Sequence, residues 1–134
     1  MFNDVIIIGG GPAGLTAGLY AARARLNSLL IERRMVGGQI TEAGHVENYP
    51  GFPAGISGLE LGELMHQQAV AHGLEIMPDE VTGLQLHNGQ KVVVASEASL
   101  IARAVIVASG SERTKLGIPG EAEFTGRGVS YCAT

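Results

Sequence analysis

A stretch of glycines that directly follows a short apolar segment constrains this chain more than any other feature. Residues 5–8 form a continuous β-branched run, which is typical of a strand buried on both faces of a parallel sheet. Residues 9–14 then match the pattern G-x-G-x-x-G, and Pro12 stands where the first turn of a helix accepts proline. This order predicts a strand, a tight turn and a helix that extends to about Arg25.

The spacing of the glycines has a physical explanation. Gly9 permits a tight turn, Gly11 lets the backbone approach a pyrophosphate, and Gly14 lets helix and strand pack closely. The start of the helix offers unpaired N–H groups and a partial positive charge to the phosphates. A second apolar run, residues 28–31, leads to Glu32, whose carboxylate can accept hydrogen bonds from ribose hydroxyls. We therefore predict half of a Rossmann unit that binds a dinucleotide.

The residues alone do not identify the dinucleotide. Arg33 and Arg34 could pair with the 2′-phosphate of NADP, but Glu32 would repel that phosphate, which favours an unphosphorylated adenosine ribose. FAD and NAD both satisfy this condition. In a purely structural alternative, the glycines only connect a strand to a helix, and Glu32 is a solvated strand end.

The middle of the chain combines a long loop with a helix. Residues 33–56 have no sustained periodicity, and ordered loops of this length are usually functional, so we expect them to build part of the site. Ser57 and Glu60 form a capping box for a helix that ends near Gly73. Its buried face is expected at Leu61, Leu64, Met65 and Ala69.

Strand signals dominate the part that follows. A short strand is expected at residues 76–77, and residues 81–87 and 90–95 flank an Asn-Gly dipeptide, which is a strong hairpin signal. A further strand at residues 100–108 would complete a three-stranded antiparallel meander. Residues 109–134 lack clear periodicity and are interpreted as a connector.

Composition and charge exclude several classes of function. The chain has 134 residues, of which 46% are hydrophobic and 16% charged, and its net charge is −4 with no basic stripe, so no nucleic-acid partner is expected. Neither a leader peptide nor an apolar run of membrane-spanning length is evident, and we expect a cytoplasmic protein without membrane association. The four histidines lack metal-ligand spacing, so no metal site is expected. The single cysteine, Cys132, fits a reducing compartment.

Three further segments, taken with the glycine turn, resemble the bacterial low-molecular-weight thioredoxin reductases. They are Gly37-Gly38-Gln39, Glu47-Asn48-Tyr49-Pro50-Gly51-Phe52 and Gly126-Arg127-Gly128-Val129-Ser130-Tyr131-Cys132-Ala133-Thr134. The resemblance spans essentially the whole chain. It implies an α/β, Rossmann-like FAD-binding domain with a parallel sheet, helices and a meander, incomplete at its C-terminal end. Residues 1–115 would be the first segment of that domain, and residues 116–134 a connector into an absent NADPH and redox-disulfide domain.

The resemblance also implies which residues hold FAD. Gln39 and Asn48 match positions that reach the flavin or its ribityl chain, and Val81 matches one beside the adenine. The tripeptide 108–110 stands where the family usually has Ala-Thr-Gly, and its serine keeps the hydroxyl. The complete set of expected cofactor-binding residues is Gly9, Gly11, Pro12, Ala13, Gly14, Glu32, Arg33, Gly37, Gly38, Gln39, Asn48, Val81, Ala108, Ser109 and Gly110.

Cys132 matches the first cysteine of the family's Cys-Ala-x-Cys redox pair, and the second would follow directly after Thr134. In such a pair one thiolate attacks the substrate disulfide while the other exchanges electrons with the flavin. The resemblance implies that the intact protein is a homodimer that passes electrons from NADPH through FAD to thioredoxin. The chain as given is expected to be a truncated piece that is inactive alone.

Two alternatives remain open at this point. Related flavoproteins, the alkyl hydroperoxide reductase flavoprotein and the ferredoxin-NADP reductases, share much of this region, although the cysteine at the end argues against the ferredoxin branch. The other alternative is a non-catalytic nucleotide-binding module that self-associates through uncovered apolar surface.

Overall fold

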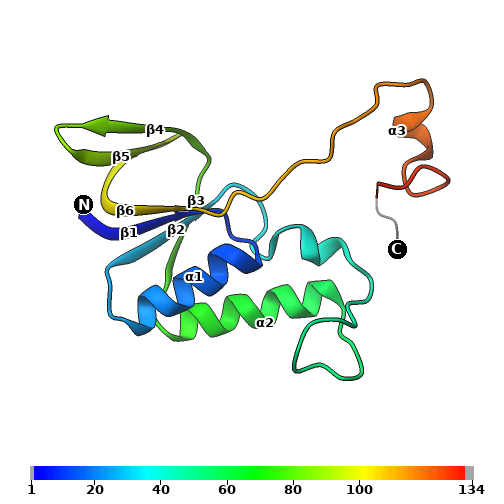
Figure 1. Ribbon diagram of the computed structural model, residues 1–134, viewed down its shortest axis with the longest axis horizontal. Coiled ribbons are helices and arrows are strands. Elements are labelled where there is room, and N and C mark those ends of the chain that lie inside the picture. Colours follow the sequence, from blue (N-terminus) through cyan, green and yellow to red (C-terminus); the bar gives the residue numbers. More distant parts are fainter. Residues whose placement is uncertain (1, 132–134) are drawn as a thin grey trace.

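The fold is a single six-stranded sheet with helices on one side, as seen in a computed structural model that describes residues 2–131 (Figure 1). The strand order is β3-β2-β1-β6-β5-β4. The α/β fold class predicted from the sequence is confirmed. The elements in chain order are β1 (Phe2–Ile8), α1 (Pro12–Arg23), β2 (Ser28–Glu32), the 3-10 helix η1 (Gly38–Glu42), α2 (Gly58–Ala71), β3 (Glu75–Pro78), β4 (Val81–His87), β5 (Gln90–Ala95), β6 (Ser99–Val107) and α3 (Glu121–Phe124).

The parallel half of the sheet is centred on β1. This strand pairs in parallel with β2 on one side and with β6 on the other, so that Ile7 is in register with both Leu30 and Ile106. Ile6, Ile7 and Leu30 are fully buried because apolar groups cover both faces of this half. The β-branched run thus forms the doubly buried strand that its sequence predicts.

Different elements cover the two faces of β1. On one face, Ile7 and Leu30 pack with Leu15 of α1 and Ala69 of α2. Figure 1 shows α1 and α2 lying side by side beneath the sheet, with the meander on the opposite side. There, Ile6 belongs to a cluster with residues of β2, β5 and β6. The carboxyl ends of the parallel strands consequently emerge between the helical layer and the meander.

The meander forms as predicted and is continuous with the parallel half. β5 pairs antiparallel with both β4 and β6, and β6 also pairs in parallel with β1. Asn88 and Gly89 have φ values of 50° and 78°, the positive values that a tight two-residue hairpin turn requires. The last strand therefore places the segment that follows it directly beside the end of β1.

The helices begin as the sequence predicts, but two details differ. The Ser57 Oγ accepts a hydrogen bond from the Glu60 N–H at 3.2 Å, which confirms the cap of α2. Helix α1 ends at Arg23 rather than near Arg25, because Arg25 adopts the left-handed conformation with φ 59°. The prediction that Leu64 is buried was wrong, since its side chain is 42% exposed.

The exposure of Leu64 follows from the narrow face that α2 buries. The buried positions of the helix are Gly58, Leu61, Gly62 and Ala69. A Cβ on Gly62 would lie 3.2 Å from the Gly37 Cα, so the loop backbone packs directly against this glycine. Because of this close approach, the buried face of α2 is centred near Gly62, and Leu64 lies at the edge of that face.

After β6 the chain runs in an extended, exposed path and then folds locally around Glu121, which is only 5% exposed. The Glu121 carboxylate accepts hydrogen bonds from the Leu116 N–H at 2.9 Å, the Gly117 N–H at 2.7 Å and the Tyr131 hydroxyl. The Tyr131 hydroxyl is the largest cause that lowers the pKa of Glu121, followed by the backbone N–H of Leu116. The charged carboxylate therefore organises residues 116–131.

We predict that acid loosens residues 116–131 before the sheet unfolds. Because folding lowers the pKa of Glu121 below its usual value of 4.5, the stabilisation is complete above that value and is lost as the pH falls through the folded-state pKa. The NMR amide signals of Leu116 and Gly117, followed from pH 7 to pH 3, should shift towards their unfolded positions. Glu121→Gln should remove this titration, and an unchanged titration in that variant would contradict the assignment.

Candidate dinucleotide site

The turn between β1 and α1 requires glycine at two positions. Gly9 has φ 106°, and a Cβ there would lie 2.4 Å from the Ala108 carbonyl oxygen. A Cβ on Gly14 would lie 1.8 Å from the carbonyl oxygen of Gly9. Both distances are far below van der Waals contact, so the strand, the turn and α1 reach this spacing only without side chains. The Gly9 and Gly14 roles inferred from the motif, a tight turn and close packing, are thus visible in the structure.

Gly11 differs from these two glycines because its missing side chain leaves open space. It is the N-cap of α1 with an ordinary φ of −75°, and the nearest atom to a Cβ there would be the Gly38 Cα at 3.8 Å. A methyl group would fit sterically, but it would fill the space next to the first turn of α1. Pro12 and Ala13 follow as the first two residues of that turn. Open backbone at a helix start suits a phosphate group.

The Gly37-Gly38 pair supports the turn from the outside. The Gly37 N–H donates a hydrogen bond to the Gly10 carbonyl at 2.8 Å, and a Cβ on Gly38 would lie 2.8 Å from the Gly11 Cα. Both residues have positive φ, 118° and 68°. Backbone therefore packs on backbone here, and the loop after β2 holds the glycine turn in place.

Glu32 joins the end of β2 to the same turn. Its Oε2 accepts a hydrogen bond from the Gly10 N–H at 2.6 Å, and its Oε1 accepts one from the Arg34 N–H at 2.8 Å. A carboxylate has about four acceptor positions, so capacity remains for ribose hydroxyls. The two halves of the motif, far apart in sequence, are thus in direct contact.

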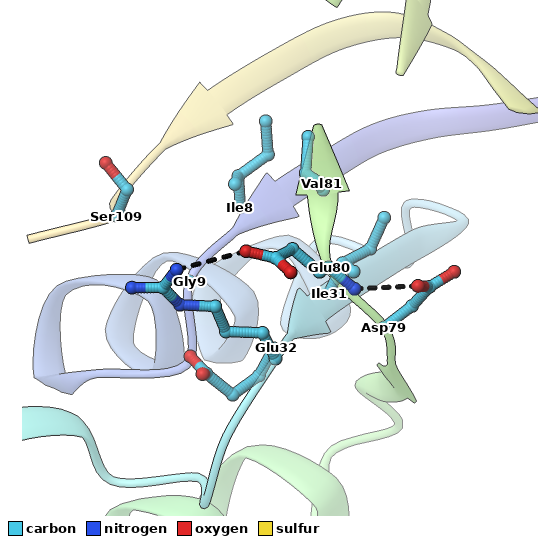
Figure 2. A pocket seen from close by; sticks show the side chains of 9 residues that line it. Ile8, Gly9, Ile31, Glu32, Asp79, Glu80, Val81 and Ser109 are labelled. Atoms are coloured by element: carbon cyan, nitrogen blue, oxygen red, sulfur yellow. Dashed lines mark hydrogen bonds and ion pairs between the residues drawn. The ribbon is translucent and has the colours of Figure 1, made fainter. Parts of the chain in front are cut away.

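A cleft of about 220 Å³ opens at the carboxyl ends of β1 and β2 (Figure 2). It is lined by Ile8, Gly9, Ile31, Glu32, Arg33, Asp79, Glu80, Val81 and Ser109. Chain connections diverge at this point, because β1 has β2 on one side and β6 on the other. In open α/β sheets, ligands bind at such a switch point. The volume is below the range of about 300–1,000 Å³ typical of complete ligand pockets, which suits one end of a larger dinucleotide.

The structure brings most of the predicted binding residues together. The cleft lining contains Gly9, Glu32, Arg33, Val81 and Ser109, and the adjoining turn contains Gly11, Pro12, Ala13, Gly14, Gly37 and Gly38. Ala108 donates its N–H to the Ile8 carbonyl at 2.8 Å, and Gly110 follows with φ 67°.

Three predicted residues lie outside this group. The Gln39 Nε2 donates a hydrogen bond to the Ser111 carbonyl, which ties η1 to the segment after β6. Asn48 lies in a separate hollow formed by residues 47–53. Cys132, the expected redox residue, lies outside the described residues.

Sequence reasoning missed three acidic residues at this site. The Asp79 carboxylate accepts hydrogen bonds from the backbone N–H groups of Glu80 at 2.7 Å and of Ser96 and Glu97 at 3.2 Å each, which pins the meander to the end of β3. Glu80 and Glu112 form ion pairs with Arg33, and the hydrogen bond to Glu80 is the largest cause that raises the pKa of Arg33. The sequence offered only the cationic pair Arg33-Arg34 beside Glu32, and it carried no sign of the distant carboxylates at positions 80 and 112.

We predict that the two kinds of glycine respond differently to alanine. Gly14→Ala should lower the free energy of unfolding by about 3 kcal/mol, because the new methyl group meets a backbone carbonyl that cannot move aside. Gly11→Ala should cost less than about 1 kcal/mol, the usual effect of losing a favourable N-cap. Urea denaturation of the two variants provides the test, and equal losses would show that Gly11 is also a packing position.

No helix within residues 2–131 is long and apolar enough to cross a membrane. The same residues contain no cluster of three or more His, Cys, Asp or Glu side chains arranged to hold a metal ion.

Comparisons with known proteins agree with this geometry. Thioredoxin reductase of Treponema pallidum (strain Nichols) is 49% identical over 131 residues, which are 98% of this chain and 43% of that protein. The crystal structure of Lactococcus lactis thioredoxin reductase superposes with a TM-score of 0.87 at 43% identity, covering 98% of this chain and 43% of the other. A ferredoxin-flavin thioredoxin reductase structure from Clostridium acetobutylicum gives 0.76 at 34% identity, covering 98% and 45%.

The chain thus spans less than half the length of the relatives it matches. The resemblance to thioredoxin reductases expected from the sequence is confirmed for the region that the chain covers. The profile of one protein family, described as pyridine nucleotide-disulphide oxidoreductase, matches residues 3–134. Because this match extends over nearly every residue, and the glycine turn, Glu32 and the cleft lie within it, the chain belongs to the pyridine nucleotide-disulphide oxidoreductase family.

Proposed function

We propose that this chain is the FAD-binding part of a thioredoxin reductase. The observation that carries the proposal is the open backbone at Gly11, next to the start of α1 and within one residue of the Gly10 N–H that contacts Glu32. This arrangement offers N–H groups to a diphosphate and a carboxylate to a ribose, in the order in which an adenine dinucleotide presents them. The similarity to curated thioredoxin reductases supports FAD over other dinucleotides.

The residues of the site fit the adenosine diphosphate end of FAD. The backbone of Gly9, Gly11, Pro12, Ala13 and Gly14 would hold the pyrophosphate, with Gly37 and Gly38 supporting the turn. Glu32 would accept hydrogen bonds from the ribose. Ile8 and Val81 line the cleft with apolar side chains, which suits the face of an adenine ring.

The flavin end would lie beyond this cleft. We assign it to Gln39, to Asn48 and to the segment of Ala108, Ser109 and Gly110. The flavin supplies hydride and electron-transfer chemistry when it is bound, and the protein orients it and controls access to it. In the structure, the Gln39 side chain binds the Ser111 carbonyl, so η1 and the segment after β6 are already joined where the flavin would approach.

For the complete protein we propose the overall reaction of a thioredoxin reductase, in which NADPH reduces the disulfide of thioredoxin. The curated relatives are more than twice as long as this chain, and NADPH would bind to the part of them that the chain does not cover. Residues 1–115 would form the first FAD segment and residues 116–134 the connector that carries Cys132. We propose a cytoplasmic homodimer.

We predict that Gly11→Ala weakens FAD binding by at least about tenfold, which corresponds to about 1.4 kcal/mol. The reason is that the new methyl group would occupy the space intended for the pyrophosphate while leaving the fold intact. Isothermal titration calorimetry with FAD measures the change. Gly44→Ala is the matched control, because a Cβ there meets nothing within 4 Å and Gly44 lies outside the site. Tight FAD binding by Gly11→Ala would refute the assignment of the turn, and absence of FAD binding by the unmodified chain would refute its cofactor.

We also predict that Glu32→Gln lowers the affinity for FAD and for ADP by the same factor, about tenfold. Both ligands carry the adenosine ribose, and a hydrogen bond to a charged group contributes about 1.5–3 kcal/mol. Glu75→Gln is a suitable control, because Glu75 is exposed at the opposite end of the parallel strands. A loss confined to FAD would place Glu32 near the flavin instead of the ribose.

A further inference from the structure

Arg33 is held by two carboxylates from distant parts of the chain. Its NH1 lies 3.1 Å from the Glu80 Oε1, and its NH2 lies 2.5 Å from the Glu112 Oε1. The same Glu112 oxygen lies 3.8 Å from the Arg34 NH2. Figure 2 shows the Glu80 side chain, which belongs to the residue just before β4, with a dashed line marking its ion pair in the cleft. Two nitrogens of the guanidinium are thus already occupied by acidic partners.

Hydrogen bonds tie the backbone near both carboxylates to neighbouring segments. Glu80 lies between Asp79, whose side chain accepts its N–H, and Ser96, whose N–H donates to the Glu80 carbonyl at 2.9 Å. Glu112 follows Ser111, whose carbonyl accepts the hydrogen bond from Gln39. The acidic partners are therefore presented to Arg33 by anchored segments.

These ion pairs contribute little to stability. The side chains of Arg33, Glu80 and Glu112 are 45%, 52% and 73% exposed, and solvent-exposed ion pairs contribute only about 0–1 kcal/mol each. The ion pairs matter more for the charge that a ligand meets in the cleft than for stability. The lining residues include three carboxylates, those of Glu32, Asp79 and Glu80, and one guanidinium. The remaining field at the cleft is consequently negative.

A 2′-phosphate on the ribose would need the opposite environment. Dinucleotide sites of this type accept it with an arginine near the end of the second strand, where a free guanidinium can bind the phosphate oxygens in a bidentate manner. Arg33 stands directly after β2 but is paired twice, and Glu32 is its neighbour in the chain. The Arg33 guanidinium therefore lies where a 2′-phosphate would bind, but two carboxylates already balance its positive charge.

We propose that Glu80 and Glu112 are specificity-determining residues of this cleft. Because these two residues hold Arg33 in ion pairs, the adenosine site excludes dinucleotides that carry a 2′-phosphate and binds those that do not. The inference rests on the proposed function, in that it takes the cleft to be the adenosine end of a dinucleotide site. It explains how a protein that uses a phosphorylated nicotinamide dinucleotide elsewhere would keep that molecule out of its FAD site.

The test compares two ligands that differ only in the 2′-phosphate, ADP-ribose and 2′-phospho-ADP-ribose. Calorimetry gives the ratio of their dissociation constants for the unmodified chain and for the double variant Glu80→Gln, Glu112→Gln. The unmodified chain should prefer ADP-ribose by about tenfold or more, and the double variant should shift the ratio by at least about tenfold towards the phosphorylated ligand. The shift reflects an unpaired Arg33 that can now bind the phosphate.

Two control variants separate this effect from net charge and from misfolding. Glu75→Gln with Glu123→Gln makes the same change in net charge at exposed positions away from the cleft, and it should leave the ratio unchanged. Adding Arg33→Gln to the Glu80, Glu112 double variant should abolish the gain in affinity for the phosphorylated ligand. Circular dichroism and the affinity for ADP-ribose show whether each variant retains its fold and its site.

The outcomes are distinguishable from those that bear on the cofactor. If the chain binds ADP-ribose and the double variant leaves the ratio unchanged, the specificity inference is overturned and the proposed function stands. An equal shift in the control pair would also overturn it, because net charge alone would then explain the effect. If the unmodified chain binds neither ligand nor FAD, the proposed function fails and this inference fails with it.

Discussion

The contact between the backbone of Gly9 and Gly14 is the constraint on which the rest of the site depends. A Cβ on Gly14 would lie 1.8 Å from the Gly9 carbonyl oxygen, so β1 and α1 can meet in this way only if position 14 has no side chain. Once this contact forms, α1 starts close to the end of β1. Its unpaired N–H groups then face the carboxyl edge of the sheet, where the cleft lies.

The sheet converts this local geometry into a binding site. Because β1 is flanked by β2 and by β6, the segments after all three strands meet at one edge. Glu32 arrives from β2 and Ser109 from β6, while the meander brings Glu80 and Val81 to the far wall. The core clusters on the two faces of β1 hold these segments in register, so a small cleft receives residues from four separate stretches of sequence.

Charge is distributed in the cleft so that one basic residue is surrounded by acidic ones. The Glu32 carboxylate is engaged by the turn, and the Arg33 guanidinium by Glu80 and Glu112. These exposed pairs contribute little to folding, but they determine which charges a ligand meets on entry. The same residues therefore connect the end of β2, the start of β4 and the segment after β6 through electrostatics rather than through apolar packing.

Prediction from sequence succeeded where the signal is local. The strand that precedes the turn, the Ser57 cap and the Asn88-Gly89 hairpin each depend on residues within a few positions of one another, and all three appear as expected. Leu64 was misplaced because its burial depends on the approach of Gly37 to Gly62, a contact between segments 25 residues apart. The spacing of apolar residues along a helix does not show which side of its apolar face a distant loop will cover.

The sequence by itself determined the glycine turn between β1 and α1 and the need for glycine at position 14, because the Cβ excluded there would meet Gly9, a few residues away. The tertiary structure decided the constraint on Gly9, whose Cβ would meet the carbonyl oxygen of Ala108, the residue after β6. Only the tertiary structure decided that Asp79 and Glu80 line the cleft and that Glu112 reaches Arg33, since these contacts bridge 47 and 79 positions of sequence. The physical reason is that an ion pair depends on the distance between two charges in space and not on their separation in the sequence. Strand order and register set which residues meet there, and no local pattern encodes either of them.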